Sequence, residues 1–280
     1  MRFTKMHGIG NDYIYVNAFE EKIADPSAVA VAVSDRHFGI GGDGLVLICP
    51  SEIADFRMRM FNADGSEGDM CGNASRCVAK YVYDRGLTDR TTVTLETPSG
   101  VKTLMMTVED GRVQSVRVDM GEPKLDCEDV PCTLGTGVVK MAPIAVLGRT
   151  FLITPVCTGN PHGVIVLDEP VETFELDKYG PALECHPAFP KKANIEFVNV
   201  LAGDRIRMRV WERGSGITLA CGTGSCAALV ACHENGLCGR KATIVLDGGE
   251  LVDEWDEATG HVFMTGPAAF VFDGAYDIRG

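Results

Sequence analysis

The sequence has no apolar run long enough to span a membrane. Apolar stretches such as 28–33 and 143–147 are much shorter than the ~20 residues that a spanning helix requires. The first eight residues, Met1 to Gly8, contain no apolar core of the kind found in a signal peptide. We therefore expect neither a membrane partner nor export.

Basic residues are scarce relative to acidic ones. The 280 residues include 26 Lys and Arg against 39 Asp and Glu, giving a formal net charge of −13. Nucleic acids and anionic membranes are bound through basic patches, so we expect neither as a partner. No run of like charges suggests an acidic tail, and no low-complexity linker separates the halves.

Cysteine is plentiful, with 11 residues in the chain. Without an export signal, this number indicates a reducing, cytoplasmic environment rather than a disulfide framework. Cys226, Cys232, His233 and Cys238 lie close in sequence, but their spacing fits no common zinc pattern. We predict no metal site.

The most informative feature is an internal repeat with an offset of 150 positions. Between Arg57 and Arg90, nine of 34 residues recur without a gap, whereas average residue usage would give about two by chance. The matches are Arg57-Met58-Arg59 with Arg207-Met208-Arg209, Cys71-Gly72 with Cys221-Gly222, Ser75 with Ser225, Gly86-Leu87 with Gly236-Leu237, and Arg90 with Arg240. The chain is therefore predicted to contain two related halves.

Most of the regular structure is predicted to be strand. Alternating or β-branched segments predict strands at Phe56–Phe61, Arg90–Glu96, Val113–Met120, Val164–Leu167, Ile195–Val200, Ile206–Trp211, Ala242–Leu246, His261–Met264 and about Ala268–Phe272. Helices are predicted at Pro26–Asp35, Asn73–Arg85 and Gly224–Asn235, the last two running into a terminal glycine. The helix at Gly224–Asn235 is apolar on every side, which indicates burial in the middle of a curled sheet.

These elements predict an α/β (α+β) protein of two pseudo-symmetric domains. The domain that carries Cys71 is predicted to comprise residues 1–120 plus 266–280, because the last strand lies beyond the second half of the repeat. The domain that carries Cys221 is predicted to comprise residues 121–265, with the boundary near Gly121-Glu122-Pro123.

Each matched cysteine is followed by glycine and a predicted helix. Thiols at helix N-termini have lowered pKa values, because exposed N–H groups and the helix dipole favour the thiolate. The same N–H groups can hold a carboxylate, and Gly72 and Gly222 would let the backbone approach it closely.

Two matched thiols facing each other across a cleft suit one kind of chemistry. One thiolate can remove the α-proton of an amino acid as a base, and the opposite thiol can return a proton to the other face as an acid. Helix N-termini around the α-carboxylate would stabilise the developing charge, so no pyridoxal phosphate or other cofactor is predicted. The competing interpretation, that Cys71 and Cys221 are buried structural cysteines, does not account for the matched turns.

At these residues the chain resembles the diaminopimelate epimerase family. Met70-Cys71-Gly72-Asn73 and Ala220-Cys221-Gly222-Thr223-Gly224 are similar to the family's two active-site signatures. The resemblance continues over nearly the whole chain in the motifs His7-Gly8-Ile9-Gly10-Asn11-Asp12, Arg36-His37-Phe38-Gly39-Ile40-Gly41, Phe61-Asn62-Ala63-Asp64-Gly65-Ser66, Thr158-Gly159-Asn160-Pro161-His162, Asn194-Ile195-Glu196-Phe197 and Trp211-Glu212-Arg213-Gly214.

The resemblance implies interconversion of LL- and meso-diaminopimelate, on the route to lysine and peptidoglycan, by a homodimer. It implies two domains, each a curved, mostly antiparallel, barrel-like sheet wrapped around a central helix. Cys71 and Cys221 would be catalytic, with His162 and Glu212 tuning the thiols. The implied substrate-binding residues are Gly72, Asn73, Gly222 and Thr223 at the reacting carboxylate, and Asn11, Asn62, Asn160, Asn194, Glu212 and Arg213 at the distal groups.

Physical chemistry agrees with these distal roles. An arginine fork suits the distal carboxylate, and a carboxylate with amide oxygens suits the distal ammonium. Simpler interpretations exist: Asn11 and Asn160 as turn formers, Glu212–Arg213 as a surface pair, and His162 as a structural histidine.

The chain also departs from the family. Ala74 and Ser75 stand where many members have Gly and Ala, Gly44 where some have a substrate-contacting Gln, and Ile217 where many have Glu. These departures mean that the motifs alone do not determine the substrate preference.

Two alternatives remain. One is a cofactor-independent racemase of another amino acid; the proline racemases carry His after the first Cys-Gly, where this chain has Asn73, but a histidine racemase shares the Cys-Gly turns. The other is a non-catalytic amino-acid-binding protein, for which the paired thiols would be unnecessary. For an enzyme, closure of the domains on the substrate is expected to shield a carbanion from water.

Overall fold

The computed structural model describes residues 1–68, 70–202 and 204–278. The last two residues of the predicted first domain, 279 and 280, lie outside the described residues. The chain divides into two units: unit 1 contains Met1–Asp119 with Thr265–Gly280, and unit 2 contains Met120–Met264. Each unit is described by itself.

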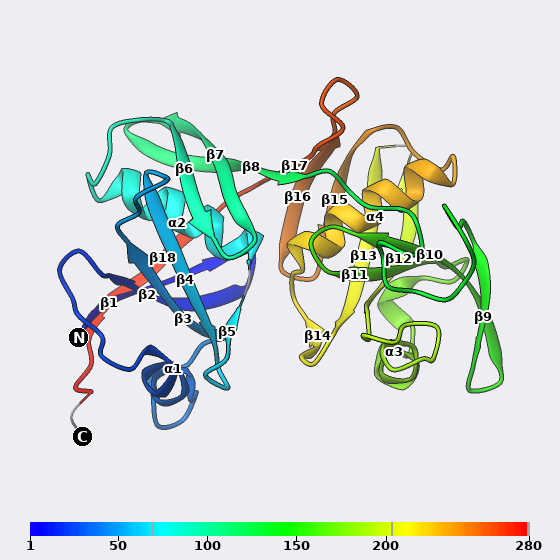
Figure 1. Ribbon diagram of the computed structural model, residues 1–280, viewed down its shortest axis with the longest axis horizontal. Coiled ribbons are helices and arrows are strands. Elements are labelled where there is room, and N and C mark those ends of the chain that lie inside the picture. Colours follow the sequence, from blue (N-terminus) through cyan, green and yellow to red (C-terminus); the bar gives the residue numbers. More distant parts are fainter. Residues whose placement is uncertain (69, 203, 279–280) are drawn as a thin grey trace. The chain divides into compact units, whose positions relative to one another are not determined.

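The described residues of unit 1 form two helices and a sheet that is mostly antiparallel (Figure 1). Its elements are β1 (Arg2–Gly8), β2 (Asn11–Asn17), α1 (Pro26–Ser34), β3 (Gly44–Cys49), β4 (Phe56–Asn62), β5 (Glu67–Gly68), α2 (Gly72–Asp84), β6 (Thr92–Thr97), β7 (Gly100–Glu109), β8 (Arg112–Gly121) and β18 (Ala269–Ala275). Two pairings are parallel, β2 with β3 and β4 with β6. The last strand, β18, returns to pair with β1.

Unit 2 repeats this arrangement. Its elements are β9 (Ala142–Val146), β10 (Arg149–Cys157), β11 (Pro161–Val166), the 3-10 helix η1 (Val171–Thr173), α3 (Leu176–Glu184), β12 (Asn194–Ala202), β13 (Arg205–Glu212), β14 (Gly216–Thr218), α4 (Gly222–Glu234), β15 (Lys241–Leu246), β16 (Gly249–Trp255) and β17 (Val262–Gly266). The parallel pairs are again the corresponding ones, β11 with β12 and β13 with β15. Helices α2 and α4 are offset by 150 positions, as the repeat predicts.

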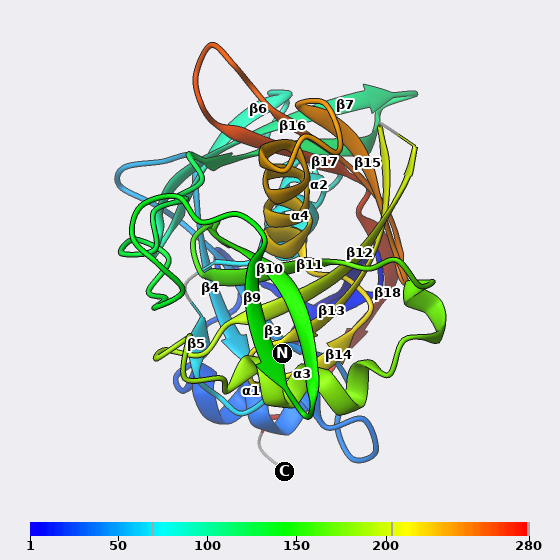
Figure 2. The same cartoon turned by 90° about the vertical axis from the view of Figure 1, so that its right-hand side faces the viewer.

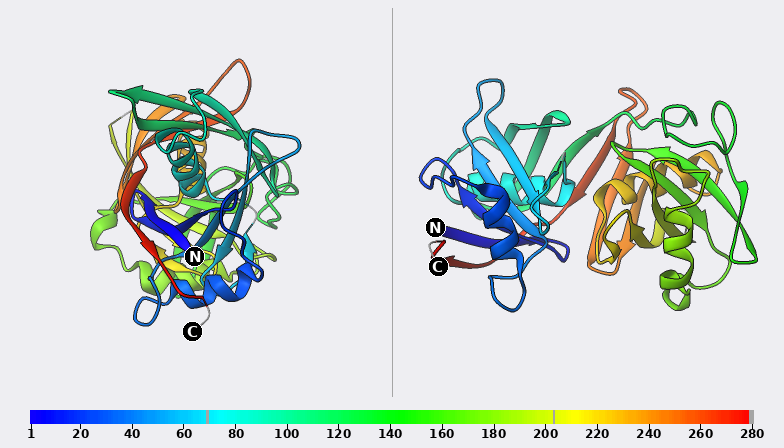
Figure 3. Two further views of the ribbon diagram at one scale, coloured as in Figure 1. Left: turned by 90° about the vertical axis from the view of Figure 1, so that its left-hand side faces the viewer. Right: turned by 60° about the horizontal axis from the view of Figure 1, so that its bottom comes forward.

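One helix in each unit is surrounded by strands. Figure 2 shows α4 with the strands of unit 2 around it, and the left view of Figure 3 shows the strands of unit 1 running round α2. Helix α4 packs against β10, β11, β12, β13, β15 and β16. Every residue from Gly224 to Cys232 is buried, so the prediction of a helix buried on all sides is confirmed.

The second helix of each unit covers the outer face of its sheet. In unit 1, α1 packs on a cluster that includes Ile14, Val16, Leu45 and Leu47. The inward-facing alternate residues of β2 and β3 are also buried, which explains why both strands read as continuous apolar runs.

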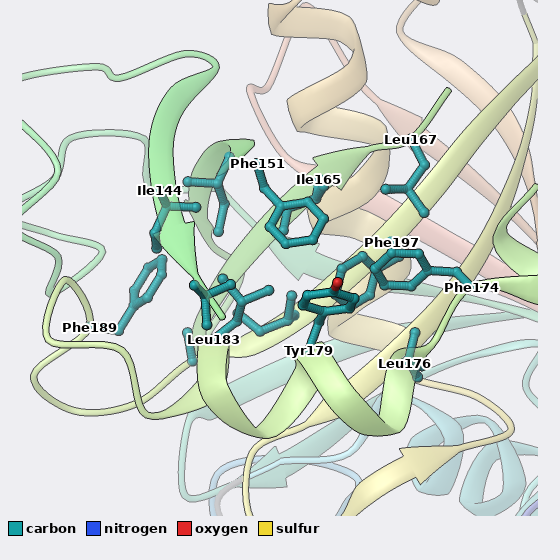
Figure 4. Packing of buried hydrophobic residues seen from close by; sticks show 14 of the residues in the cluster. Ile144, Phe151, Ile165, Leu167, Phe174, Leu176, Tyr179, Leu183, Phe189 and Phe197 are labelled. Atoms are coloured by element: carbon teal, nitrogen blue, oxygen red, sulfur yellow. The ribbon is translucent and has the colours of Figure 1, made fainter. Parts of the chain in front are cut away.

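In unit 2, the outer layer is aromatic (Figure 4). The rings of Phe174 and Tyr179 stack with centroids 5.4 Å apart, and Phe151 meets Tyr179 edge to face at 5.2 Å. Helix α3 closes this layer. Phe197 of β12 belongs to it, so Glu196, its neighbour in the strand, faces the opposite side, towards α4.

The predicted fold class, two repeated halves with curved sheets and few helices, is confirmed. The strand predictions were incomplete. In unit 1, β1, β2, β3, β5 and β7 were not identified as strands, and in unit 2, β9, β10, β14 and β16 were not. Predicted boundaries were also displaced: β6 begins at Thr92 rather than Arg90, and β11 begins at Pro161 rather than Val164. The start of β11 was not recognised because its first residue is Pro161, and proline is uncommon within strands.

Helix α3 was not predicted, because it contains Gly180 and Pro181, which weaken a helical pattern. The structure gives the reason for the glycine: a Cβ at position 180 would lie 2.6 Å from the ring of Trp211. Among the described residues, no helix has the length and apolar character needed to cross a membrane.

Candidate active site

The two matched cysteines occupy the same position in their units. Cys71 is the N-cap of α2, and its sulfur accepts a hydrogen bond from the backbone N–H of Ala74 at 3.4 Å. Cys221 is the N-cap of α4, and its sulfur accepts from the N–H of Gly224 at 3.3 Å. The predicted placement of both thiols at helix N-termini is confirmed.

A cysteine is not a usual N-cap residue, since Ser, Thr, Asp and Asn are preferred there. A sulfur that accepts from the third residue of the helix replaces the hydroxyl or carboxylate of an ordinary cap. The first-turn amides, from Gly72 and Asn73 or from Gly222 and Thr223, have no partner four residues earlier in the helix. Each helix start therefore provides a sulfur and a set of N–H donors suited to a carboxylate.

In the first half-site, Asn11 lies beside the thiol. The Sγ of Cys71 donates to Oδ1 of Asn11 at 3.4 Å, while Nδ2 of Asn11 donates to Asp43 at 2.8 Å. The backbone N–H of Asp12 donates to the same Asp43 oxygen at 3.0 Å. Because an ionised carboxylate only accepts, Asp43 fixes which end of the Asn11 amide faces the sulfur.

Asp43 belongs to a charged cluster. Arg36 pairs with Asp43 at 3.0 Å and with Asp12 at 2.9 Å, and Lys5 pairs with Asp12 at 2.5 Å. Burial opposes ionisation of Asp12, but hydrogen bonds from Arg36 and Lys5 outweigh it and hold its pKa below the usual value. Burial, assisted by the charge of Asp12, raises the pKa of Asp43.

The side chain of Asn73 is also fixed by a hydrogen bond from a neighbouring residue. It is buried in the first turn of α2, and Nη2 of the fully buried Arg76 donates to its Oδ1 at 2.7 Å. The guanidinium also donates to the carbonyl of Pro267 at 3.2 Å. Asn62 lies at the end of β4, with Nδ2 donating to Ser66 at 3.0 Å.

The second half-site contains a buried pair, His162 and Glu196. Nδ1 of His162 lies 2.6 Å from Oε1 of Glu196, and Nε2 lies 2.7 Å from Oδ1 of Asn160. Both side chains of the pair are fully buried. The structure thus brings the predicted residues His162 and Asn160 together and adds Glu196.

Cys221 is buried, with the Thr223 hydroxyl 3.5 Å from its sulfur. Burial raises the pKa of Cys221 well above the usual value, and the charges of Glu212 and Glu196 raise it further, against the hydrogen bonds from Thr223 and Gly224. The expectation that the helix N-terminus lowers the pKa is therefore wrong for Cys221. Desolvation of the thiolate and two carboxylates outweigh the helix dipole.

The distal-binding candidates of unit 2 form a second group. The backbone N–H of Arg213 donates to Oδ1 of Asn194 at 2.9 Å, and Nδ2 of Asn194 donates to the carbonyl of Pro161 at 3.1 Å. Asn194 therefore ties the start of β11 to the turn that presents the exposed Arg213. Glu212 accepts a hydrogen bond from Thr218.

Sequence reasoning missed four residues that support these side chains: Asp43, Arg76, Glu196 and Thr158. Thr158 donates to the carbonyl of Thr223 at 2.9 Å. One of them carried a signal, because Glu196 is a charged residue between apolar neighbours in the predicted strand Ile195–Val200. Among the described residues, no three His, Cys, Asp or Glu side chains form a group that could hold a metal ion.

Solved structures share this architecture. A hydroxyproline epimerase from Agrobacterium vitis superposes with a TM-score of 0.73 at 17% identity, covering 98% of this chain and 91% of that one. A Bacillus anthracis phenazine biosynthesis protein of the PhzF family gives a TM-score of 0.70 at 17% identity, with 99% of each chain covered. The fold is therefore that of the proline racemase and PhzF-like proteins, built from two repeated halves.

Sequence relatives narrow the class. The profile described as diaminopimelate epimerase matches residues 3–125 and 154–271. The diaminopimelate epimerase of Acetivibrio thermocellus is 57% identical over 279 residues, covering 100% of this chain and 99% of that protein, and that of Methanococcus maripaludis strain C5 is 55% identical over 278 residues, covering 99% and 100%. The chain belongs to the diaminopimelate epimerase family, and it is an isomerase, a cofactor-independent epimerase.

Proposed function

We propose that the protein interconverts LL- and meso-diaminopimelate by proton transfer between two cysteines at one α-carbon. The observation that carries the proposal is the matched pair of N-cap thiols, Cys71 and Cys221, in a chain of this family. Units 1 and 2 are then the two half-site domains, each supplying one thiol.

The reaction balances without a cofactor. A thiolate takes the α-proton and becomes a thiol, leaving a carbanion whose charge spreads into the α-carboxylate. The opposite thiol gives its proton to the other face of the carbon and becomes the thiolate. Helix N-termini stabilise the charge that develops on the carboxylate, a role for which Gly72, Asn73, Gly222 and Thr223 stand in the first turns of α2 and α4.

The distal end of the substrate is a zwitterion. The exposed guanidinium of Arg213 suits its carboxylate, while Glu212 and asparagine oxygens suit its ammonium. Asn194 supports this role from behind, because it positions the backbone at Arg213. Asn11, Asn62 and Asn160 complete the proposed set of binding residues, and His162 and Glu212 tune the thiols.

The first test is proton NMR in D₂O with LL-diaminopimelate and no added cofactor. Deuterium should appear at the α-carbon together with the meso isomer. Exchange of histidine or proline but not diaminopimelate would move the assignment to another amino-acid racemase. Absence of exchange with every amino acid would favour the binding-protein alternative.

Cys71→Ser and Cys221→Ser test the two-base mechanism separately. Serine is a good N-cap, so each helix start should be preserved while the acid or base is lost. Each variant should lose at least ~10²-fold in kcat, the usual lower limit for one acid–base group. A wild-type rate in either variant would contradict the mechanism.

We also propose that the enzyme works in the cytoplasm as a homodimer, on the route to lysine and peptidoglycan. Size-exclusion chromatography with light scattering tests the oligomeric state. A monomeric mass at working concentration would remove the dimer from the proposal.

A further inference from the structure

The carboxylate of Glu184, the last residue of α3, joins three segments of unit 2. Its Oε2 accepts a hydrogen bond from the indole Nε1 of Trp211 at 2.8 Å. Its Oε1 accepts from the backbone N–H of Gly214 at 3.2 Å and pairs with Nζ of Lys192 at 3.2 Å. Glu184 is only 6% exposed, so both oxygens of a buried carboxylate are hydrogen-bonded to donors from other segments.

Gly214 belongs to the turn at residues 213–215, which connects β13 to β14 and presents the exposed Arg213. The N–H of Arg213 donates to Oδ1 of Asn194 at 2.9 Å, and the next N–H along the chain, that of Gly214, donates to Glu184. Two consecutive backbone amides of the turn are therefore held from outside it, one by a side chain of β12 and one by a side chain of α3.

Trp211, which leads into this turn, packs closely on both neighbouring elements. A Cβ at Gly180 of α3 would lie 2.6 Å from the indole ring, and a Cβ at Gly216 of β14 would lie 3.5 Å from it. The ring therefore contacts the backbone of the helix that carries Glu184 and of the strand that follows the turn. Its hydrogen bond to Glu184 fixes the end of β13 relative to α3.

The corresponding turn of unit 1 has a different set of residues around it. At the offset of 150 positions, Ser34, Phe61 and Ala63 stand in the places of Glu184, Trp211 and Arg213. Both turns are closed by the same backbone hydrogen bond, from the third residue of the turn to the last residue of the preceding strand, at 2.9 Å in unit 1 and 3.1 Å in unit 2. The fold therefore closes this turn without a buried carboxylate, and the carboxylate occurs in the unit whose turn carries an arginine.

We propose that Glu184 is a positioning residue for substrate binding, which fixes the backbone at Gly214 and thereby holds the guanidinium of Arg213 in place for the distal carboxylate of the substrate. This inference deepens the proposed function and rests on it. Nη1 of Arg213 donates to the carbonyl of Lys191 at 3.2 Å, in the segment that connects Glu184 to β12. Arg213 is thus held both at its backbone and at its guanidinium, whereas the buried Glu184 does not touch the substrate.

The donors around Glu184 keep its carboxylate charged. Burial opposes ionisation, but the hydrogen bonds from Trp211, Lys192 and Gly214 outweigh burial and hold the pKa of Glu184 below its usual value. Because an ionised carboxylate only accepts and its hydrogen bonds are stronger than neutral ones, it holds the N–H of Gly214 more firmly than an uncharged side chain would.

The test is the steady-state epimerisation of diaminopimelate by Glu184→Gln, which removes the charge with little change of shape. KM should rise about tenfold while kcat stays within about threefold of wild type, because distal contacts stabilise the bound substrate and the transition state alike. Glu175→Gln is the matched control, since Glu175 is exposed just before α3, where it pairs with Lys178 at 2.9 Å. This control should leave both kinetic constants unchanged.

Two double variants separate positioning from a purely structural role. In an Arg213→Ala background, Glu184→Gln should raise KM by less than about twofold, because two residues that act through the same contact are not additive. In a Trp211→Phe background, which copies Phe61 of unit 1, no indole N–H is left unpaired. Glu184→Gln should still raise KM about tenfold there, since the hydrogen bond to Gly214 is lost in either background.

A wild-type KM in folded Glu184→Gln would overturn the inference, as would a full tenfold rise in the Arg213→Ala background. No effect in the Trp211→Phe background would also overturn it, because the carboxylate would then serve only the indole. Circular dichroism establishes folding. If Glu184→Gln does not fold, the double variant Glu184→Ser with Trp211→Phe, which copies Ser34 and Phe61 of unit 1, takes its place.

A readout without substrate keeps this inference distinct from the proposed function. Hydrogen exchange at the amide of Gly214, followed by NMR, should be about tenfold faster in Glu184→Gln than in wild type and unchanged in Glu175→Gln, because only the former loses the acceptor. Equal exchange in all three proteins would contradict the inference. A wild-type protein that exchanges no α-proton of diaminopimelate would refute the proposed function without altering the amide result.

Discussion

At the scale of residues, the two half-sites use the same amide differently. Asn11 is held by its Nδ2 group on Asp43 and turns its oxygen to Cys71. The corresponding Asn160 has its oxygen on Nε2 of His162, which leaves its Nδ2 group for other partners. The same side chain therefore turns its oxygen to the thiol in unit 1 and to an imidazole nitrogen in unit 2.

The Lys5–Asp12 pair should make stability depend on pH. Lys5 is buried, and Asp12→Asn would leave its ammonium without a carboxylate, at a cost of about 2–4 kcal/mol at pH 7. Because the folded-state pKa of Asp12 is lowered, the stabilisation exists above the unfolded pKa of ~3.9 and disappears as the pH falls through the folded value.

Urea unfolding of the wild type and of Asp12→Asn at pH 7 and pH 3 measures this contribution. The difference in unfolding free energy between the two proteins should be large at pH 7 and smaller at pH 3. An equal gap at both pH values would show that Asp12 acts through packing rather than charge.

At the scale of elements, α2 and α4 share their length and N-cap but differ inside. Helix α4 is buried all round because six strands of unit 2 pack around it. Its first turn has glycine at position 224 where α2 has Ala74, a difference that follows from Glu196 below.

Gly224→Ala should therefore lower both activity and stability, despite the better helix propensity of alanine. The new methyl group would have to displace the Glu196 carboxylate or the Cys221 sulfur. We expect at least a tenfold loss in kcat/KM and a lower melting temperature. The matched variant Ala74→Gly should lower the free energy of unfolding by at most about 1 kcal/mol, which is the difference in helix propensity between alanine and glycine.

Thermal melts and initial rates on the two variants decide this point. A Gly224→Ala enzyme as stable and as active as wild type would mean that Glu196 can move aside freely. In that case the close approach under α4 would not constrain the thiol.

At the scale of the whole molecule, unit 1 is completed by the end of the chain. Strand β18 pairs with β1 over Arg2–Ala275 to His7–Ala269, and Arg85 of α2 binds Asp273. The ends also meet, since the backbone N–H of Tyr276 donates to the carbonyl of Met1 at 2.8 Å. Unit 1 thus depends on pairing between residues more than 260 positions apart, such as Arg2 with Ala275.

Removing residues 269–280 should therefore damage unit 1 selectively. Strand β1 would lose one of its two neighbours, leaving an unpaired edge. Both tryptophans, Trp211 and Trp255, lie in unit 2, so their fluorescence should stay native-like while hydrogen exchange in residues 2–17 accelerates. Epimerase activity should also be lost, because unit 1 carries Cys71.

Full-length protein under the same conditions is the control. If the truncated chain loses native tryptophan fluorescence at the same urea concentration as its exchange protection in unit 1, the units unfold together. That outcome would contradict the selective loss.

The sequence by itself determined the repeat, the two cysteine turns, the central helices and the family. These features depend on local pattern: a Cys-Gly pair at the start of each of two helices, a helix with no polar face, and motifs in a fixed order. Alternation also located β4, β8 and β13 well. The sequence did not identify β2, β3 or β10, because strands buried on both faces lose the period of two.

Only the tertiary structure decided which residues support the side chains of the candidate site. Asp43, Arg76 and Glu196 reach their partners, Asn11, Asn73 and His162, through contacts between different elements or across a helix turn. The direction of the pKa shift at Cys221 depends on burial and on carboxylates from two other strands, which a motif around position 221 does not contain. Local chemistry placed both thiols at helix starts, and only the packed environment made them different.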